Sequence, residues 1–348
     1  MWRAGAAWWA AVASCCVGSG CSDDAAIVAA AGATADAVGG DAAVGLLIAA
    51  DGRGALAGSW AACAAVAKAY CDKLNACYPH PLHALHGTVA HCTERETLRC
   101  ALLLAAPGAD ATMTLMSACA AQVKAETCDF IREDQAPICW FGAGQRADGA
   151  VCGADSQCQG RYCAIGIGKT CGVCGQVSAL GQACVLGQCV AGTRCVFDAT
   201  QKGYRCRSRE SKGGPCNDGF KLESACGWGL SCLAGGTCGA AGAKVGAVCT
   251  ATGCNHALGL DCSKNDKTCK TIAMGKPGDS CSVAGISSDT YVECLDGACG
   301  NQNDMGAGKC APRVEDGAGC DSWTGPFCRP PARCVDKVCT LPTYGSCG

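Results

Sequence analysis

The spacing of apolar residues divides the chain into two regions. Between Ser59 and Pro79, apolar side chains recur at steps of three and four residues, which is the period of an amphipathic helix. The same period predicts three more short helices: one from Val89 to before Pro107, a second entered through Asp110 and running over 113–123, and a third over 129–136. We therefore expect a small four-helix, cysteine-rich domain over residues 59–148.

From Gly149 onward a cysteine repeat replaces the helical period. The motif Gly-x-x-Cys occurs six times, and its opening cysteines are Cys152, Cys184, Cys216, Cys249, Cys281 and Cys320, at successive steps of 32, 32, 33, 32 and 39 residues. A fixed period indicates an array of small units. The spacers are rich in residues that favour turns, and the glycine of each motif suits either a positive φ or the close approach of another chain segment. Residues 149–348 are thus predicted to form six tandem modules, each a short β-hairpin or two held by two disulfides.

Thirty-four cysteines are expected to form disulfides. Eight lie in the helical region: Cys63, Cys71, Cys77, Cys92, Cys100, Cys119, Cys128 and Cys139. The modules contain Cys152, Cys158, Cys163 and Cys171; Cys184, Cys189, Cys195 and Cys206; Cys216, Cys226, Cys232 and Cys238; Cys249, Cys254, Cys262 and Cys269; Cys281, Cys294, Cys299 and Cys310; and Cys320, Cys328, Cys334 and Cys339. Cys174 and Cys347 complete the set, and each module has three possible pairings.

Composition favours a chain stabilised by disulfides. Of 348 residues, 37 are Cys and only 18 are Phe, Trp or Tyr, so we expect a small hydrophobic contribution and a disulfide scaffold. The formal net charge of −2 gives no basic field for nucleic acid. No run of about 20 apolar residues could span a bilayer.

The first 20 residues resemble a lipoprotein signal peptide. A positive start precedes a short apolar stretch, and Val12-Ala13-Ser14-Cys15 is similar to a bacterial lipobox. Cys15 is the expected lipidation site, with Cys21 as the alternative and an ordinary cleaved secretory signal as a second interpretation. Residues 21–58, rich in Ala, Gly and Asp, are expected to form a tether. We expect an exported chain, lipid-anchored in a bacterial envelope at the outer membrane or cell surface.

The first module resembles the N-terminal cysteine-rich domain of Dickkopf proteins. The matching segments are Cys152-x5-Cys158, Gly160-Arg161-Tyr162-Cys163, Cys171-x2-Cys174, Cys184-x4-Cys189 and Gly192-Thr193-Arg194-Cys195. Where the Dickkopf pattern has adjacent cysteines, this chain has Cys189 alone. Since a lipobox is bacterial, the resemblance implies the fold of small disulfide modules and not the receptor antagonism of the animal family.

Two metal hypotheses compete with these predictions. Thiolate clusters favour tight spacings, which occur only at Cys171-x2-Cys174, and export favours oxidation. Four histidines gather as His80, His83, His86 and His91, and steps of three on a helix could hold a transition metal. Pro79 and Pro81 interrupt the helix among them, so we expect a solvated helix start, no metal and no cofactor.

Motifs for catalysis and ligand binding are sparse. Gly168-Lys169-Thr170 ends like a phosphate-binding loop but lacks its first glycine and its strand–helix setting. A basic cluster comprises Lys202, Arg205, Arg207, Arg209 and Lys212. It is either a solvated connector or a site for an anionic polysaccharide.

These observations lead to one functional expectation and two alternatives. We expect a non-catalytic, lipid-anchored surface protein whose modules serve adhesion, recognition or envelope organisation, with a protein or polysaccharide partner and no nucleic acid. The first alternative is a protease inhibitor or secreted effector, for which the long 282–293 spacer would be the binding loop. The second is a hydrolase with a site in the helical domain.

Overall fold

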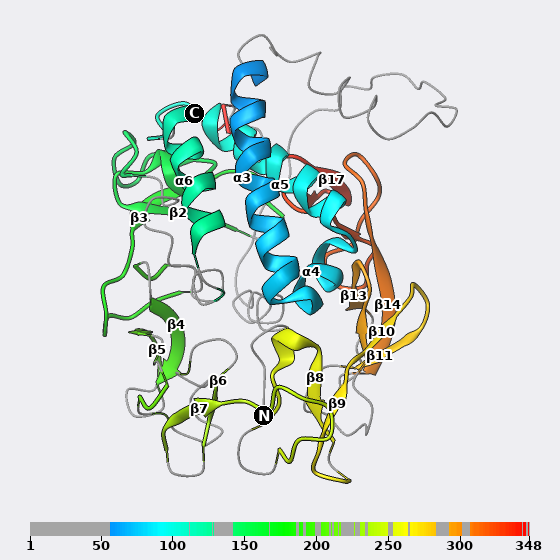
Figure 1. Ribbon diagram of the computed structural model, residues 1–348. Helices are drawn as coiled ribbons and strands as arrows, with labels where there is room; N and C mark the ends of the chain where they lie inside the picture. Colours follow the sequence, from blue (N-terminus) through cyan, green and yellow to red (C-terminus); the bar gives the residue numbers. More distant parts are fainter. Residues whose placement is uncertain are drawn as a thin grey trace.

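Helices at the N-terminal side and small strand pairs at the C-terminal side form the fold, as predicted (Figure 1). The computed structural model describes residues 56–110, 112–126, 128, 142–166, 168–185, 188–190, 193–198, 203–208, 210, 212–214, 216, 226, 230–233, 236–249, 253–263, 265–282, 292–300, 307–342, 344–345 and 347. The signal peptide, most of the tether and the helix predicted over 129–136 lie outside these residues. No helix of the described part is long and apolar enough to cross a membrane.

Four helices are described: α3 (Leu56–Cys77), α4 (Pro79–His86), α5 (Val89–Leu104) and α6 (Met113–Ala125). Thr88 and Thr112 cap α5 and α6, because each threonine Oγ1 accepts the N–H of the third residue onward at 3.1 Å. The first predicted helix ends before Pro79, as expected, but the two prolines do not interrupt the helix that carries the histidines. Both prolines lie in the first turn of α4, where a missing N–H costs nothing and the fixed φ of proline suits the helix.

Disulfides staple α3 to α5 in an antiparallel arrangement. Cys63 pairs with Cys100, and Cys71 pairs with Cys92. The two cysteines of each helix are eight residues apart, a little over two turns, so both face the partner helix. A third bond joins Cys77 to Cys128. The core between the helices also contains apolar side chains: Leu74, Tyr78, Leu82 and Val123 are buried together.

The strands of the module region are short. They are β1 (Val151–Cys152), β2 (Arg161–Ile165), β3 (Gly172–Gln176), β4 (Thr193–Asp198), β5 (Gly203–Ser208), β6 (Leu230–Cys232), β7 (Cys238–Ala240), β8 (Leu260–Cys262), β9 (Cys269–Thr271), β10 (Ala273–Gly275), β11 (Ser280–Ser282), β12 (Val292–Cys294), β13 (Gly297–Gly300), β14 (Ala307–Val314), β15 (Phe327–Cys328), β16 (Arg333–Val335) and β17 (Val338–Thr340). Two short 3-10 helices, η3 (Asp155–Gln157) and η4 (His256–Leu258), lie between them. Each module contains one antiparallel hairpin: β2–β3, β4–β5, β6–β7, β8–β9, β13–β14 or β16–β17.

The opening glycine has the same role in all six modules. Its φ lies between 80° and 90° every time, at Gly149, Gly181, Gly213, Gly246, Gly278 and Gly317. Its N–H donates to the carbonyl of the last cysteine of the module's hairpin at 2.7–2.8 Å. The N–H of that cysteine donates in turn to the carbonyl of the residue after the glycine, at 2.8–2.9 Å. The prediction of a positive φ is confirmed. The space around each of these positions is open, so the backbone conformation, and not a close contact, selects glycine.

Neighbouring modules are joined by backbone pairing. The segment that leaves one hairpin forms a parallel bridge with the second cysteine of the next module, at Ser178–Cys189, Glu210–Cys226 and Gly242–Cys254. Strand pairs β10–β12 and β14–β15 repeat this contact for the last two modules. Each connector is therefore also part of the module that follows.

The modules follow one another around the helices and close into a ring. In Figure 1 they run from β2–β3 on the left, past β6–β7 and β8–β9 below, to β14 and β17 on the right. Cys171 of module one bonds to Cys347 near the C-terminal end, 176 residues away. Gln157 Nε2 also donates to the Tyr344 carbonyl at 3.3 Å. The first and last modules are thus neighbours in space.

Candidate functional site

The cysteines of each module share one pairing scheme. The third and fourth cysteines lie directly opposite each other on the hairpin, as Cys163 and Cys174 do on β2 and β3. Each bonds to a cysteine of the preceding loop: the third to the first and the fourth to the second. The same scheme joins Cys184–Cys195, Cys189–Cys206, Cys226–Cys238, Cys249–Cys262, Cys254–Cys269, Cys281–Cys299, Cys294–Cys310, Cys320–Cys334 and Cys328–Cys339. Cys119 and Cys216 are also disulfide-bonded.

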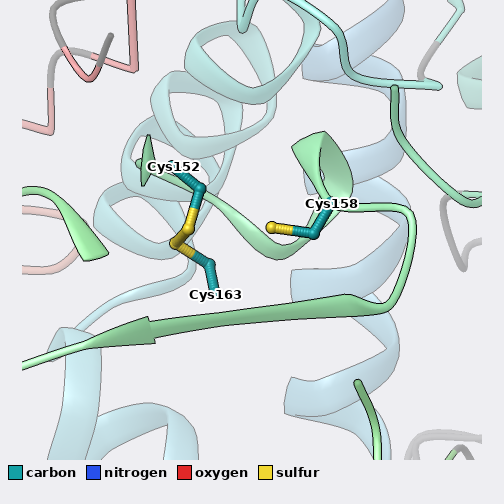
Figure 2. A group of neighbouring side chains, drawn as sticks. All are labelled: Cys152, Cys158 and Cys163. Atoms are coloured by element: carbon teal, nitrogen blue, oxygen red, sulfur yellow. A yellow bond between two sulfur atoms is a disulfide. The ribbon is translucent and has the colours of Figure 1, made fainter. Parts of the chain in front are cut away.

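Figure 2 shows how closely the sulfur atoms of a module approach one another. Cys152 and Cys163 form a disulfide, and the sulfur of Cys158 points toward it. The three sulfur atoms lie within 4.8 Å of one another. Thiolates at such distances would suit a metal ion, but here the pairs are oxidised. The disulfide prediction is confirmed for the described cysteines, and fifteen bonds of this kind indicate an extracellular or secreted protein.

One assignment within module one is wrong. Cys171 was expected to be its fourth cysteine, but Cys174 has that place: it lies opposite Cys163 and bonds to Cys158. The register of β2 and β3 decides between the two, because Cys174 shares a face with Cys163 and Cys171 precedes the strand. Cys171 is thereby left to close the ring with Cys347.

Buried charges join the helical domain to the last module. Arg95 on α5 is only 3% exposed, and its guanidinium donates to both carboxylate oxygens of Asp316 at 2.7 and 2.8 Å. It also donates to the carbonyls of Arg329 and Pro330 at 3.0 and 2.7 Å. A buried arginine with this full set of partners fixes the orientation of two segments far apart in sequence.

A second pair continues this network. Arg329 donates to both oxygens of Asp296 at 2.7 and 2.8 Å and to Glu315 at 3.0 Å. Burial lowers the pKa of the neighbouring Arg313 to about 10, which leaves it charged at neutral pH. Each of these carboxylates therefore faces arginine, and the arrangement fastens modules five and six to the helices.

The histidines of α4 are not a solvated helix start; that prediction is wrong. His80 is 8% exposed and His86 is 5% exposed, because α4 packs against modules that lie far away in sequence. The three histidines of α4 also have different surroundings. His83 Nδ1 contacts the Gly87 carbonyl at 2.9 Å. Burial lowers the pKa of His86. His91 is exposed on α5. They do not converge on a three-histidine metal site.

His80 meets two residues that sequence reasoning missed. Its Nε2 contacts Glu293 Oε2 on β12, and its ring lies edge-on to His256 on η4, with centroids 5.4 Å apart and planes at 89°. Burial lowers the pKa of His256, and the charge of Glu293 acts in the opposite direction. Neither residue belongs to a local motif, so the sequence offered no signal for this cluster.

The other predicted sites are only partly described. Lys202, Arg209 and the spacer residues 283–291 lie outside the described part of the chain. On β5, Arg207 is exposed, whereas Arg205 donates from Nη1 to the Gly181 carbonyl at 3.1 Å. Lys169 offers its backbone carbonyl to Arg333 at 3.5 Å. It lies in the connection between β2 and β3, without the helix that a phosphate-binding loop requires.

One pair of positions recurs on the modules, and we call it the outward pair. Most of its residues are exposed, whereas Arg205 and Thr268 are half-buried. It consists of the residue before the first cysteine and the residue before the fourth, which face each other across a backbone bridge. The pairs are Val151–Val173, Ala183–Arg205, Val248–Thr268, Ser280–Lys309 and Gly319–Val338. The valines are well exposed, from 43% at Val338 to 67% at Val248. A constant disulfide scaffold thus carries a different surface chemistry in each of these modules.

Comparisons of the chain with protein-family models, curated proteins and solved structures give no match.

Proposed function

We propose that the protein is an exported, lipid-anchored, non-catalytic surface protein whose ring of modules binds a protein or polysaccharide partner. The observation that carries this proposal is the outward pair. Scaffold positions are constant from module to module, while the exposed pair changes from two valines to serine with lysine. Binding residues often lie on loops positioned by a rigid scaffold, so exposed residues that differ from module to module suit a recognition surface.

The use of buried polar groups supports a role without catalysis. A general acid or base must be oriented beside a space that admits a substrate. Where the described helices and modules meet, Asp316 and Asp296 instead each accept two hydrogen bonds from the guanidinium group of an arginine. This use is structural, and it favours a binding protein over the hydrolase alternative.

The lipid anchor is supported by the residues at the start of the chain. Val12-Ala13-Ser14-Cys15 resembles a lipobox, with Cys21 as a second candidate. Disulfides require an oxidising compartment, and a tether of Ala, Gly and Asp would hold the ring away from a membrane surface. The resemblance of module one to Dickkopf proteins adds a precedent for the scaffold alone.

Membrane fractionation of a bacterium that produces the full chain tests the anchor. Cys15→Ser combined with Cys21→Ser should release the protein from membranes or leave it as a precursor, whereas wild type should fractionate with membranes and take up labelled fatty acid. A double variant that fractionates like wild type contradicts lipid anchoring.

Binding to immobilised polysaccharides and to intact producing cells tests recognition. Val248→Ser combined with Thr268→Ser changes one outward pair and should weaken binding, because Val248 is 67% exposed. Lys267→Ser, exposed in the same module, is the matched control. Inhibition of a protease without such binding would favour the inhibitor alternative, and turnover of any substrate would contradict a non-catalytic role.

A further inference from the structure

Three ligand-type side chains meet where the helical domain contacts modules four and five. His80 comes from the first turn of α4, His256 begins η4, and Glu293 lies at the centre of β12. These segments are far apart in sequence and are brought together only by the closed ring. Two imidazoles and one carboxylate form a donor set that zinc and related divalent metals use in proteins.

The backbone around His80 is shaped to hold its ring. Gly259 ends η4 in the left-handed region at φ 72°, and its N–H donates to the His256 carbonyl at 2.8 Å. A Cβ added to Gly259 would lie 2.9 Å from His80 Nδ1, so a side chain there would displace the histidine. The ring is thereby positioned with Nε2 toward Glu293. Ala257 of η4 also packs against the helical core, which fixes the position of η4.

A simple ion pair does not account for the whole cluster. Glu293 touches His80 and also acts electrostatically on His256, so one carboxylate serves two imidazoles. The ring of His256 lies beside this pair, with its centroid 5.4 Å from that of His80. A bound cation would use all three side chains, because neutral imidazoles and a carboxylate are suitable ligands and the carboxylate supplies negative charge. Glu293 retains 26% exposure, which gives an ion a route from solvent.

We propose that His80, His256 and Glu293 form a binding site for one divalent transition-metal ion of the zinc type. The site joins α4 to modules four and five, so the ion would fasten the helical domain to the ring. The proposal goes beyond surface recognition and does not depend on it. It concerns nitrogen and oxygen ligands only, and therefore it leaves the disulfides oxidised.

Metal titration of the full, oxidised protein tests the site. Alkylation first establishes that no free thiol is present, so that cysteine cannot bind the metal. Co²⁺ is then added as the probe, followed by Zn²⁺. We expect one equivalent of Co²⁺ to give visible d–d bands without a thiolate charge-transfer band, and one equivalent of Zn²⁺ to displace it. Zn²⁺ should also raise the thermal unfolding midpoint, because it binds the folded state.

Variants separate this cluster from other sites. His256→Gln and Glu293→Gln should each weaken Zn²⁺ binding by at least about tenfold, since even outer-sphere partners of a metal ligand are worth roughly that much. His91→Gln removes an exposed histidine of α5 outside the cluster and should bind like wild type. Circular dichroism and the disulfide mass of each variant establish that it has folded.

The outcomes are distinct. Loss of binding in both cluster variants, with retention in His91→Gln, supports the site. Absence of stoichiometric binding in wild type overturns it, and so does binding that survives both cluster substitutions. A charge-transfer band from sulfur would place the ion on cysteine and would also overturn the proposal. If Glu293→Gln does not fold, His256→Gln alone decides, because His256 is only half-buried and lies on the short η4 turn outside the strands.

Discussion

The helical domain and the modules are stabilised by different means. The helical core combines cysteines with Leu74, Leu82 and Val123, so apolar burial contributes alongside disulfides. The buried cluster of module one consists of Cys152, Cys158, Cys163 and Cys174. Units of about 30 residues cannot bury enough apolar surface to fold alone, and covalent bonds replace it. One chain can therefore use helix packing in one region and disulfide cross-links in the next, each where local length and composition require it.

Complete reduction of the disulfides should produce the largest difference in stability between the two regions. Each disulfide of a module closes a loop of 11 to 18 residues, worth about 3 kcal/mol in the chain-entropy model. Losing two such bonds exceeds what a module with so few buried apolar side chains can supply, so the modules should unfold first. Trypsin under reducing conditions should cleave at Lys270 and Lys337 before it cleaves within α3 or α5. Equal protection of both regions would show that the modules have another source of stability.

Replacing Arg95 by Ala should break the junction between the two regions. The substitution leaves Asp316 buried without its partner, which typically costs about 3–5 kcal/mol. We expect a lower urea midpoint and faster amide exchange in both α5 and module six. Lys68→Ala is the matched control, because its ion pair with Asp72 is exposed at 67% and 50% and is worth at most about 1 kcal/mol. Similar losses in both variants would contradict a structural role for the buried pair.

Opening the ring by removing the bond between Cys171 and Cys347 should lower the stability of the protein less than the two changes above. Cys171→Ala combined with Cys347→Ala removes one cross-link, and disulfides typically contribute about 2–4 kcal/mol. Part of this loss is offset by contacts that remain, such as Gln157 with the Tyr344 carbonyl. Hydrogen exchange should rise in modules one and six and stay unchanged in modules two and three. A change spread evenly over all modules would mean that the ring acts as one cooperative unit.

The smallest effect is expected at an opening glycine. Gly149→Ala forces a side chain into the left-handed region at φ 83°, at a cost of about 1–2 kcal/mol. Urea unfolding of module one, followed by exchange at the Cys174 amide, measures it. Gly166→Ala is the control in the same module, because its φ is not positive and its nearest neighbour is a flexible lysine side chain at 3.8 Å. Equal stability of the two variants would show that the positive φ is not what selects glycine.

Features set by neighbouring residues could be predicted from the sequence, whereas those set by distant contacts could not. The six modules, their hairpins and the positive φ of Gly149 and its equivalents follow from period and turn chemistry, which are local. Cys171 and Cys174 are three residues apart, and only strand register shows which one belongs to the module. His80 and Glu293 are 213 residues apart, and no spacing rule connects them. The burial of α4 was missed for the same reason.

The distance in sequence between Cys171 and Cys347 also determines when their disulfide can form. Cys171 reaches the oxidising compartment 176 residues before its partner, a wait of roughly 9–35 s when export follows synthesis at about 5–20 residues per second. During that interval its thiol can exchange with every new disulfide nearby. The correct bond can form only when Cys347 has been made, so a truncated chain keeps a reactive thiol at Cys171.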